Sequence, residues 1–261
     1  MSVKIAVAGK GGTGKSIIAA CLARRFSEGG GQAYAVDADP CGGLGAALGF
    51  SGAEISGIKP ITDISEFIDT GDDDALYLSA PDAGSFDGQY SLFAGNVHFL
   101  KMARVKPADS GCYCREHRFL QALIKSMLLE ENDALILDMG AGVEPLIRGT
   151  VKNVDILLIV SEAGRASIEV SRAIRALGAG LGIGRVYIVA NKIRNEKEEL
   201  LIRAGFQRGE LIGLVRMSKA LADPLYGIGS QREQKPFIMP AGIEELYLNL
   251  TGLTFTGDQN R

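Results

Sequence analysis

Short runs of consecutive apolar residues recur along the 261-residue chain and alternate with segments of helical pattern. These runs do not alternate with polar residues, which is typical of parallel strands that are covered on both faces. The predicted strands are residues 4–8, 32–37, 76–78, 134–138, 156–160, 186–190 and 211–215, and the clearest helical patterns are residues 17–23, 167–177 and 196–204. The alternation predicts an α/β fold, in which a doubly wound, mostly parallel sheet carries helices on both faces.

The sequence contains no obvious linker or internal repeat, and we expect a single domain over residues 1–261. Residues 40–75 are rich in glycine and aspartate, and we expect short helices and loops there. Residues 72–74 are three consecutive aspartates, which we interpret as a solvated loop cluster in preference to a metal site. The chain becomes polar near its end, and we expect the tail from about residue 251 to fray.

Composition and charge narrow the class of protein. Hydrophobic residues make up 46% of the chain, but the longest apolar runs, such as residues 156–160, are far shorter than the roughly 20 residues that cross a bilayer. A net charge of −3 argues against a nucleic-acid-binding surface, and the tail lacks a basic amphipathic helix for membrane attachment. A strand begins within the first few residues, which leaves no room for a signal peptide. We expect a soluble cytoplasmic protein that binds neither nucleic acid nor membrane.

Residues 9–16, Gly-Lys-Gly-Gly-Thr-Gly-Lys-Ser, lie between the first predicted strand and the first predicted helix. A strand, a glycine-rich loop, Lys-Ser and a helix together form the P-loop pattern of nucleoside triphosphatases. Glycines let successive backbone N–H groups turn toward an anion, and the helix N-terminus adds positive potential. We therefore expect Lys15 to reach the β- and γ-phosphates of ATP or ADP and Ser16 to bind Mg²⁺. The predicted nucleotide-binding residues of this loop are Gly11, Gly12, Thr13, Gly14, Lys15, Ser16 and Ile17.

Two further predicted strands end in carboxylates, and parallel strands bring their carboxyl ends to one edge of the sheet. Asp37 and Asp39 follow the second strand, where hydrolysis would need a carboxylate that orients water for attack on the γ-phosphorus. We expect Asp37 near the Mg²⁺ shell or in a structural role, while turn-forming aspartates before proline are the alternative for both. Asp138 follows the strand over residues 134–138, where it can hold Mg²⁺ through a water and the glycines after it can sense the γ-phosphate.

Four cysteines do not make a disulfide scaffold in a chain of this length. Cys21 falls in an apolar helical stretch and is interpreted as a core residue, and Cys41 receives no role. Cys112 and Cys114 differ, because they lie in a polar and charged segment, Gly-Cys-Tyr-Cys-Arg-Glu-His.

Two thiolates can chelate Zn²⁺ or Ni²⁺ but fill only half of a four-ligand shell. Arg115 and Arg118 would favour the thiolate form of this pair. A twofold dimer would supply the same two sulfurs again and complete the shell. Exposed loop thiols remain the alternative, and His98 and His117 are alternative ligands.

The loop at residues 10–16 resembles the deviant Walker A motif of the MinD and nitrogenase-iron-protein class of ATPases. The resemblance implies that Lys10 reaches across a dimer interface to the partner's nucleotide phosphates. It also implies that Asp39 orients the attacking water, and that Asn191 and Lys192 bind the adenine. Arg216 and Met217 could complete the base pocket, although they match no motif.

The Cys-Tyr-Cys-Arg-Glu element at residues 112–116 narrows the resemblance to the CooC family, the nickel-insertion ATPases of carbon monoxide dehydrogenase maturation. Residues 6–12, 34–37, 138–142 and 191–195 also match that family. The resemblance implies an ATPase that uses Mg²⁺ and forms a homodimer promoted by nucleotide and metal. It also implies Ni²⁺ or Zn²⁺ bound by the cysteine pair, and a nickel-dependent carbon monoxide dehydrogenase, or an acetyl-CoA synthase, as client.

Two alternatives stay open at this point. An electron-transfer ATPase like the nitrogenase iron protein would bridge its dimer with an iron–sulfur cluster, but that class uses two separated cysteines per subunit. A positioning ATPase of the MinD or ParA kind would need a lipid- or DNA-binding surface, which the charge pattern does not supply.

Overall fold

The computed structural model describes residues 2–39, 42–63, 68–70, 76–78, 86, 88–102, 114–127, 129–143, 151–219 and 237–256, with the backbone alone described at 68–70, 76–78, 114–115 and 253–256. The strands of the main sheet are β1 (Val3–Gly9), β2 (Ala33–Asp37), β5 (Ser91–Ala94), β6 (Val97–Lys101), β7 (Ala134–Asp138), β8 (Ile156–Ser161), β9 (Val186–Ile193) and β10 (Leu211–Arg216). The helices are α1 (Lys15–Ser27), α2 (Leu44–Ala47), α3 (Gly52–Gly57), α4 (Cys114–Ser126), α6 (Arg165–Gly180), α7 (Glu196–Gly205) and α8 (Ile243–Thr256), with a 3₁₀ turn at Ile61–Asp63.

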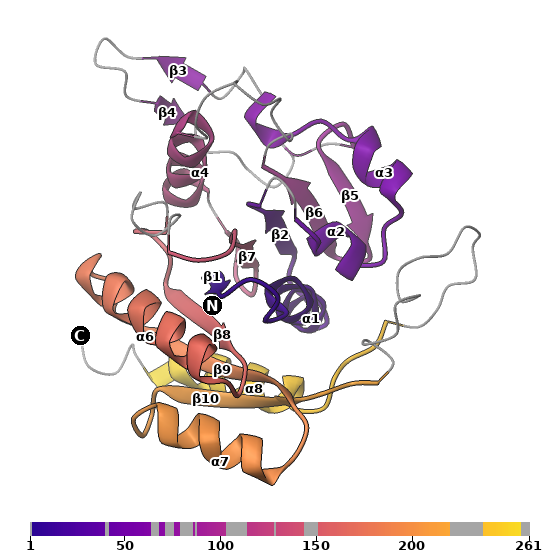
Figure 1. The fold of residues 1–261 in the computed structure, drawn as a ribbon. Helices are drawn as coiled ribbons and strands as arrows, with labels where there is room; N and C mark the ends of the chain where they lie inside the picture. Colours follow the sequence, from indigo (N-terminus) through magenta and orange to yellow (C-terminus); the bar gives the residue numbers. More distant parts are fainter. Residues whose placement is uncertain are drawn as a thin grey trace, which may run out of the picture.

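The sheet has the strand order β10-β9-β8-β1-β7-β2-β6-β5 (Figure 1). Every neighbouring pair is parallel except β5 and β6, which form an antiparallel hairpin at one edge. The predicted doubly wound, mostly parallel sheet is therefore confirmed. Because β1 lies in the middle of this order, the ends of β7 and β2 on one side and of β8 and β9 on the other meet around the loop that follows it.

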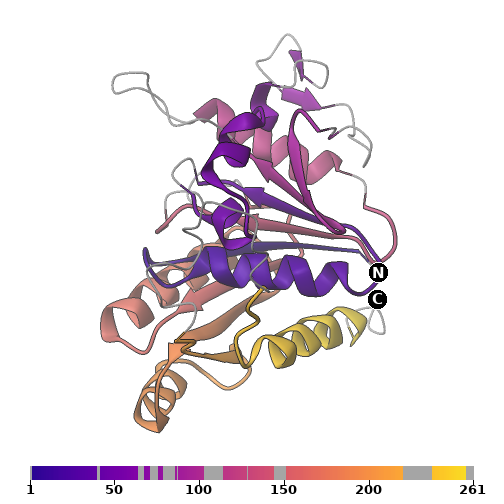
Figure 2. The ribbon, with the colours of Figure 1, turned by 90° about the vertical axis from the view of Figure 1, so that its right-hand side faces the viewer.

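Helices cover both faces of the sheet, as the strand patterns predict. On β1, the side chains of Val3, Ile5 and Val7 pack in one core with α1, α2 and α8, whereas Ala6 and Ala8 face a second core with α4 and α6. Figure 2 shows α1 and α8 side by side on the first face, where the Phe26 and Tyr247 rings meet edge to face at 5.0 Å. The continuously apolar strands thus bury alternate residues against helices on opposite sides.

Two expectations about the elements need correction, and one pair of strands was not predicted. Residues 76–78 form β4 (Leu76–Leu78), which pairs antiparallel with β3 (Ile68–Thr70) in a separate small sheet and not with the main sheet. The hairpin of β5 and β6 was not predicted, although Gly95 and Asn96 between its strands form a two-residue turn of a recognisable kind. The expected fraying from residue 251 is wrong as far as Thr256, because α8 continues the apolar spacing of Leu246 and Leu250.

The amphipathic helix α4 also escaped prediction, because charged residues at its start obscure the apolar stripe of Phe119, Leu120, Leu123 and Ile124. The Lys4 ammonium donates hydrogen bonds to the carbonyl oxygens of Ile124 at 2.5 Å and Met127 at 3.0 Å, near the end of this helix.

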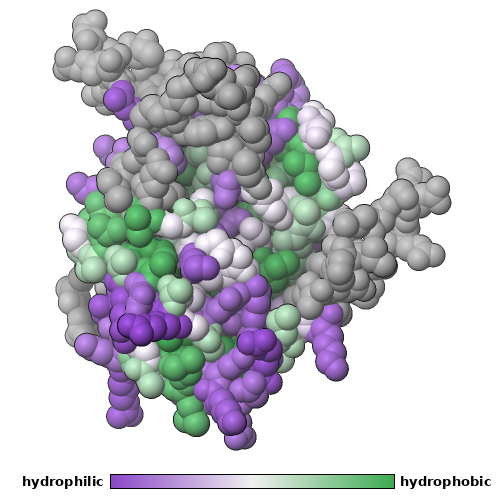
Figure 3. All heavy atoms as spheres, viewed as in Figure 1, coloured by the Kyte–Doolittle hydropathy of each residue, from purple (hydrophilic) through white to green (hydrophobic). Residues whose placement is uncertain are grey.

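The face in Figure 3 is mainly hydrophilic over α7, with apolar side chains between the charged ones. Leu200 and Leu201 of α7 are among the exposed large hydrophobic residues. Within the described part of the chain, no helix combines the length and the apolar character needed to cross a bilayer.

Candidate functional site

The loop between β1 and α1 folds as the glycine spacing predicts. Its last residue, Gly14, has φ +91° and precedes Lys15 at the start of α1. A Cβ atom on Gly14 would lie 2.4 Å from Asn191 Nδ2, so a side chain here is excluded both by backbone strain and by a neighbouring strand. The loop is thus pressed against the end of β9, and its backbone N–H groups lie at the N-terminus of a 13-residue helix, which favours anions.

Lys15 lies inside this loop and is buried, with 8% of its surface exposed. Its ammonium donates to the Lys10 carbonyl at 3.4 Å, and the Thr13 hydroxyl donates to the same oxygen at 2.9 Å. Burial lowers the pKa of Lys15, while the charges of Asp138 and Asp39 partly offset this effect. A buried cation with one long hydrogen bond is well suited to exchange that contact for a phosphate oxygen.

The ends of β7 and β2 bring the predicted carboxylates together beside Lys15. The strand register places Asp37 directly opposite Asp138, and the half-buried Asp39 lies close enough to influence both Asp37 and Asp138. Burial raises the pKa of Asp138 to about 6, against a hydrogen bond with Ser16 and the charge of Lys15, which both lower it. Asp138 is 1% exposed, and its Oδ1 has no hydrogen-bond partner among the residues that the structure describes.

Asp37 is held by the backbone of the loop that follows β2. Its carboxylate accepts hydrogen bonds from the N–H groups of Asp39 at 3.3 Å and Leu44 at 3.2 Å. A Cβ atom on Gly42 would lie 1.9 Å from Asp37 Oδ1, so this loop needs a glycine to close over the carboxylate. Burial, and then the charge of Asp138, raise the pKa of Asp37 to about 8. We expected Asp37 either near the Mg²⁺ shell or in a structural role. These contacts with the loop backbone favour the structural role.

The residues around Asp138 fit a magnesium site in which the phosphates of a bound nucleotide supply the remaining ligands. Mg²⁺ prefers oxygen ligands and is usually held by one or two protein groups together with waters and phosphates. Here the Ser16 hydroxyl and the Asp138 carboxylate lie in hydrogen-bond contact, and the buried Asp138 Oδ1 is available to a water or an ion. No group of three or more His, Cys, Asp and Glu side chains arranged for a metal occurs among the described residues.

The end of β9 lies on the other side of the loop. Asn191 is 6% exposed, and its Nδ2 donates to the Thr13 carbonyl oxygen at 2.8 Å. Asn191 and Lys192 border a cavity of about 330 Å³ next to α1. The residues that line this cavity are Gly14, Ile17, Asn191, Lys192, Arg216, Met217, Ser218 and Pro240. The structure thus brings the sequence-predicted base-binding residues together with Arg216 and Met217, and adds Ser218 and Pro240, which the sequence did not indicate.

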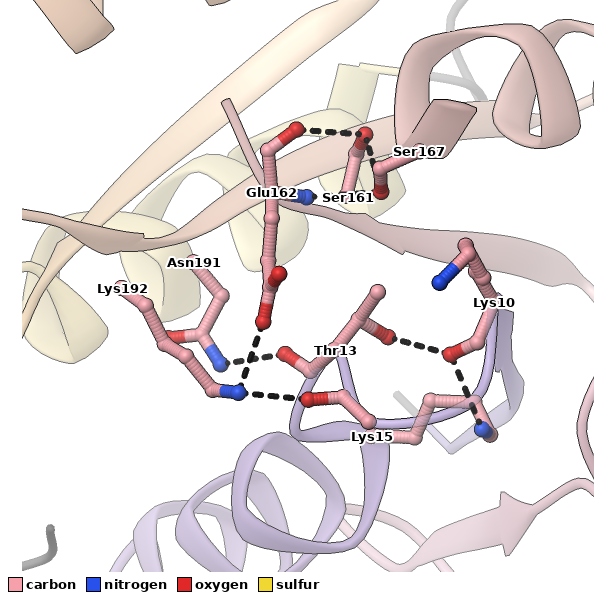
Figure 4. Close-up of polar contacts among 9 residues, drawn as sticks. Lys10, Thr13, Lys15, Ser161, Glu162, Ser167, Asn191 and Lys192 are labelled. Atoms are coloured by element: carbon pink, nitrogen blue, oxygen red, sulfur yellow. Dashed lines mark hydrogen bonds and ion pairs between the residues drawn. The ribbon is translucent and has the colours of Figure 1, made fainter. Parts of the chain in front are cut away.

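Figure 4 shows a contact that the sequence did not predict. The Lys192 ammonium donates to the Gly12 carbonyl oxygen at 2.5 Å and forms an ion pair with Glu162 Oε1 at 2.6 Å. Glu162 follows β8, and its backbone N–H donates to the Ser167 hydroxyl at 2.9 Å. The sequence signal was a Ser-Glu pair at the end of a buried strand, which by itself resembles an ordinary strand-to-helix turn.

Lys10 is exposed and borders a second cavity, of about 500 Å³, on the far side of Lys192. Other cations that line this cavity are paired within the chain: Arg165 with Glu169, Lys192 with Glu162, and Arg194 with Glu198. Within the described residues, the Lys10 ammonium forms no ion pair with a carboxylate of the chain.

The predicted cysteine pair lies at the boundary of the described residues. Cys112 and Cys41 lie outside the described residues, and Cys114 begins α4 without a described side chain. Cys21 is buried in the core as expected, and burial raises the pKa of its thiol to about 12, so it is unreactive. The expected alternative ligand His98 instead lies on β6, with its Nε2 3.0 Å from Gln32 Oε1. The other, His117, lies in α4.

Comparisons with known proteins agree with this geometry. The sequence model of one protein family, the CobQ/CobB/MinD/ParA nucleotide binding domain, matches residues 4–227 of this chain. The carbon monoxide dehydrogenase accessory protein CooC of Rhodospirillum rubrum is 32% identical over 224 residues, which cover 84% of this chain and 85% of that protein. An uncharacterised ATP-binding protein of Methanocaldococcus jannaschii is 33% identical over 205 residues, covering 76% of this chain and 78% of the relative.

Solved structures share the fold at lower sequence identity. The cell division ATPase MinD of Pyrococcus furiosus superposes with a TM-score of 0.64 at 19% identity, covering 97% of this chain and all of MinD. A plasmid partition protein of Borrelia burgdorferi bound to AMPPNP superposes with a TM-score of 0.66 at 14% identity, covering 98% of this chain and all of that protein. At these identities the likeness shows the fold alone.

Proposed function

The chain belongs to the CobQ/CobB/MinD/ParA family of nucleotide-binding domains and, within it, to the CooC group of ATPases, and from this membership we propose that it is an ATP-dependent metallochaperone that supports nickel insertion into carbon monoxide dehydrogenase. The observation that carries the proposal is the 32% identity to CooC over 84% of this chain. The Cys-x-Cys pair at residues 112 and 114 supplies the chemistry that nickel would need.

Hydrolysis of ATP would use the residues around β1. Lys15, buried and close to Asp138, would bind the β- and γ-phosphate oxygens in place of the Lys10 carbonyl. Ser16 and Asp138 would hold Mg²⁺, which when bound neutralises charge that develops on the phosphates. Asp39, less buried than its two neighbouring aspartates, would orient the attacking water.

The adenine would occupy the 330 Å³ cavity. Asn191 supports this assignment because its Nδ2 is committed to the Thr13 carbonyl, which leaves its amide oxygen to accept a hydrogen bond from an amino group. The apolar stem of Lys192 and the side chains of Ile17 and Met217 would pack on the base.

A homodimer would complete both ligand sites. Lys10 supports this part of the proposal, because its ammonium is exposed at a cavity whose other charges are already paired within the chain. It is thus available to the phosphates bound by a second copy. The cysteine pair of each copy would contribute half of a four-thiolate site for Ni²⁺ or Zn²⁺.

The experiment that tests this proposal measures metal content and mass together. After anaerobic purification, sedimentation of the metal-free, Ni²⁺, ADP and ATP forms should show that nickel and nucleotide each favour the dimer, because each binds it better than the monomer. One metal per two chains is expected, and it should be lost in the Cys112→Ala/Cys114→Ala variant. One metal per monomer with no change in mass would refute the shared site.

Colour separates this function from the iron–sulfur alternative. A cluster gives a broad brown absorbance, whereas bound Zn²⁺ is colourless. Ni²⁺ thiolates also absorb visible light, so the protein is purified anaerobically without added nickel. The proposal predicts no brown absorbance in that protein, and a brown dimer that loses its colour in the double cysteine variant would favour electron transfer instead.

A further inference from the structure

We infer that Glu162 is a positioning residue for nucleotide binding, which holds Lys192 across the phosphate-binding loop and so builds one wall of the base pocket. The inference deepens the proposed function, because it rests on the assignment of the 330 Å³ cavity to adenine. Glu162 itself does not line that cavity, so it acts through Lys192.

The ammonium of Lys192 is fixed by two partners from distant parts of the chain. Gly12, 180 residues earlier, supplies a carbonyl oxygen at 2.5 Å, and Glu162 supplies a carboxylate oxygen at 2.6 Å. Figure 4 shows the Lys192 side chain reaching from the end of β9 toward Glu162. Its stem therefore lies close to the loop, with Cε 3.8 Å from the position of a Cβ on Gly14.

The backbone conformation of Lys192 indicates that surrounding contacts hold this side chain in its position. Lys192 has φ +59°, a left-handed conformation that a residue with a side chain rarely adopts. Such a conformation persists where surrounding contacts determine it, and it is frequent at ligand clamps. Here the preceding residue, Asn191, donates a hydrogen bond to the Thr13 carbonyl, and the Lys192 ammonium donates one to the Gly12 carbonyl. Two neighbouring residues of β9 thus bind two consecutive carbonyl oxygens of the loop.

Glu162 is itself held in place to serve as this partner. Its backbone N–H donates to the Ser167 hydroxyl at 2.9 Å, and the Ser161 and Ser167 hydroxyls lie 3.2 Å apart at the start of α6. The carboxylate reaches Lys192 from the side of the 500 Å³ cavity, which Glu162, Lys192 and Lys10 all line. Lys192 and Met217 line both cavities and thus form the partition between them. Without the Glu162 carboxylate, the Lys192 ammonium would keep only the Gly12 carbonyl as a partner. The Lys192 side chain, which separates the two cavities, would then become more mobile.

The test compares ligands with and without a base in the full-length protein. Titration calorimetry gives the Kd of Mg–ADP and of Mg–pyrophosphate, which share the diphosphate and differ by the adenosine. Because both side chains of the ion pair are about 40% exposed, we expect Glu162→Gln to weaken ADP binding by about 2- to 5-fold. Pyrophosphate binding should change by less than about 1.5-fold, since the phosphate-binding N–H groups are untouched.

A double-mutant cycle and a matched control complete the design. In a Lys192→Met background, Glu162→Gln should change ADP affinity by less than about 1.5-fold, because the partner through which it acts is gone. Glu198→Gln removes another carboxylate that lines the 500 Å³ cavity, the one paired with Arg194, and should leave the Kd of ADP unchanged. In steady-state hydrolysis the Glu162→Gln loss should appear in the KM for ATP and not in kcat.

The outcomes separate this inference from the proposed base pocket. If the wild-type protein bound ADP no more tightly than pyrophosphate, the assignment of the cavity to adenine would fail. If ADP bound more tightly and Glu162→Gln left its affinity unchanged, or weakened both ligands equally, the positioning role of Glu162 would be overturned. Equal effects of Glu162→Gln with and without Lys192→Met would overturn it as well.

Discussion

Replacing Asp37 by asparagine should change the stability of the ligand-free protein in a pH-dependent way. The carboxylate is 7% exposed and faces Asp138, and burial together with that charge raises the pKa of Asp37 to about 8. In an unfolded chain an aspartate has a pKa near 4. The folded state therefore holds this proton more tightly than the unfolded state does, and the free energy of unfolding falls as the pH rises between the two values.

The size of the effect follows from the width of that interval. Each pH unit between the two pKa values is worth about 1.4 kcal/mol, so ionisation of Asp37 alone costs the wild-type protein roughly 3 to 4 kcal/mol of stability between pH 5 and pH 8. Asparagine cannot ionise and escapes this loss, but its amide accepts only one of the hydrogen bonds from Asp39 and Leu44. Losing one costs about 1 to 3 kcal/mol at either pH. We expect the Asp37→Asn variant to be less stable than wild type by about 1 to 3 kcal/mol at pH 5, and to gain about 3 to 4 kcal/mol relative to wild type by pH 8.

Urea unfolding in EDTA without nucleotide, followed by circular dichroism at pH 5 and pH 8, measures this difference. Asp133 offers a matched control, since it is 5% exposed and accepts hydrogen bonds from the N–H groups of Gln32 and Glu130, but lies beside His98 instead of a carboxylate. Asp133→Asn should be less stable than wild type at both pH values. If the stability difference between Asp37→Asn and wild type were the same at pH 5 and pH 8, the account of this buried pair would be wrong.

Three further substitutions probe the nucleotide site. Lys15→Ala should abolish Mg–ATP hydrolysis, because it removes the buried cation of the loop, and near-normal turnover would contradict the phosphate assignment. Asp39→Ala should retain ATP affinity in equilibrium titration but lower kcat by about 10²-fold or more, and a joint fall of binding and hydrolysis would make Asp39 a structural or metal-shell residue. Gly14→Ala should weaken ADP binding by at least about 10-fold, because its Cβ would lie 2.4 Å from Asn191 Nδ2, and unchanged ADP affinity would disprove the packing described here.

The sequence was most informative where local pattern and chemistry coincide. The apolar run at residues 4–8, the glycines after it and the Lys-Ser pair predicted β1, the loop and α1 together, because each belongs to one short motif. Asp37 and Asp138 were placed at one edge of the sheet because parallel strands end there, and the strand register puts them side by side.

Other features depend on packing that spans the chain. The contact of Lys192 with Gly12 requires β9 to lie two strands from β1, with β8 between them, and no local pattern specifies that order. The left-handed backbone of Lys192 likewise follows from contacts and not from residue type. The charged start of α4 hid a helix whose apolar stripe becomes meaningful once Leu120 and Ile124 face the second core.

The central claim is that this ATPase delivers nickel to carbon monoxide dehydrogenase, and transfer of radioactive nickel tests it most directly. The nickel-loaded protein is mixed with nickel-free carbon monoxide dehydrogenase, and nickel content and carbon monoxide oxidation by the client are followed with and without Mg–ATP. We predict that ATP accelerates both, and that Lys15→Ala and the Cys112→Ala/Cys114→Ala variant do not support them. Equal nickel uptake by the client with Lys15→Ala, or with the same concentration of free Ni²⁺ and no added ATPase, would contradict the claim.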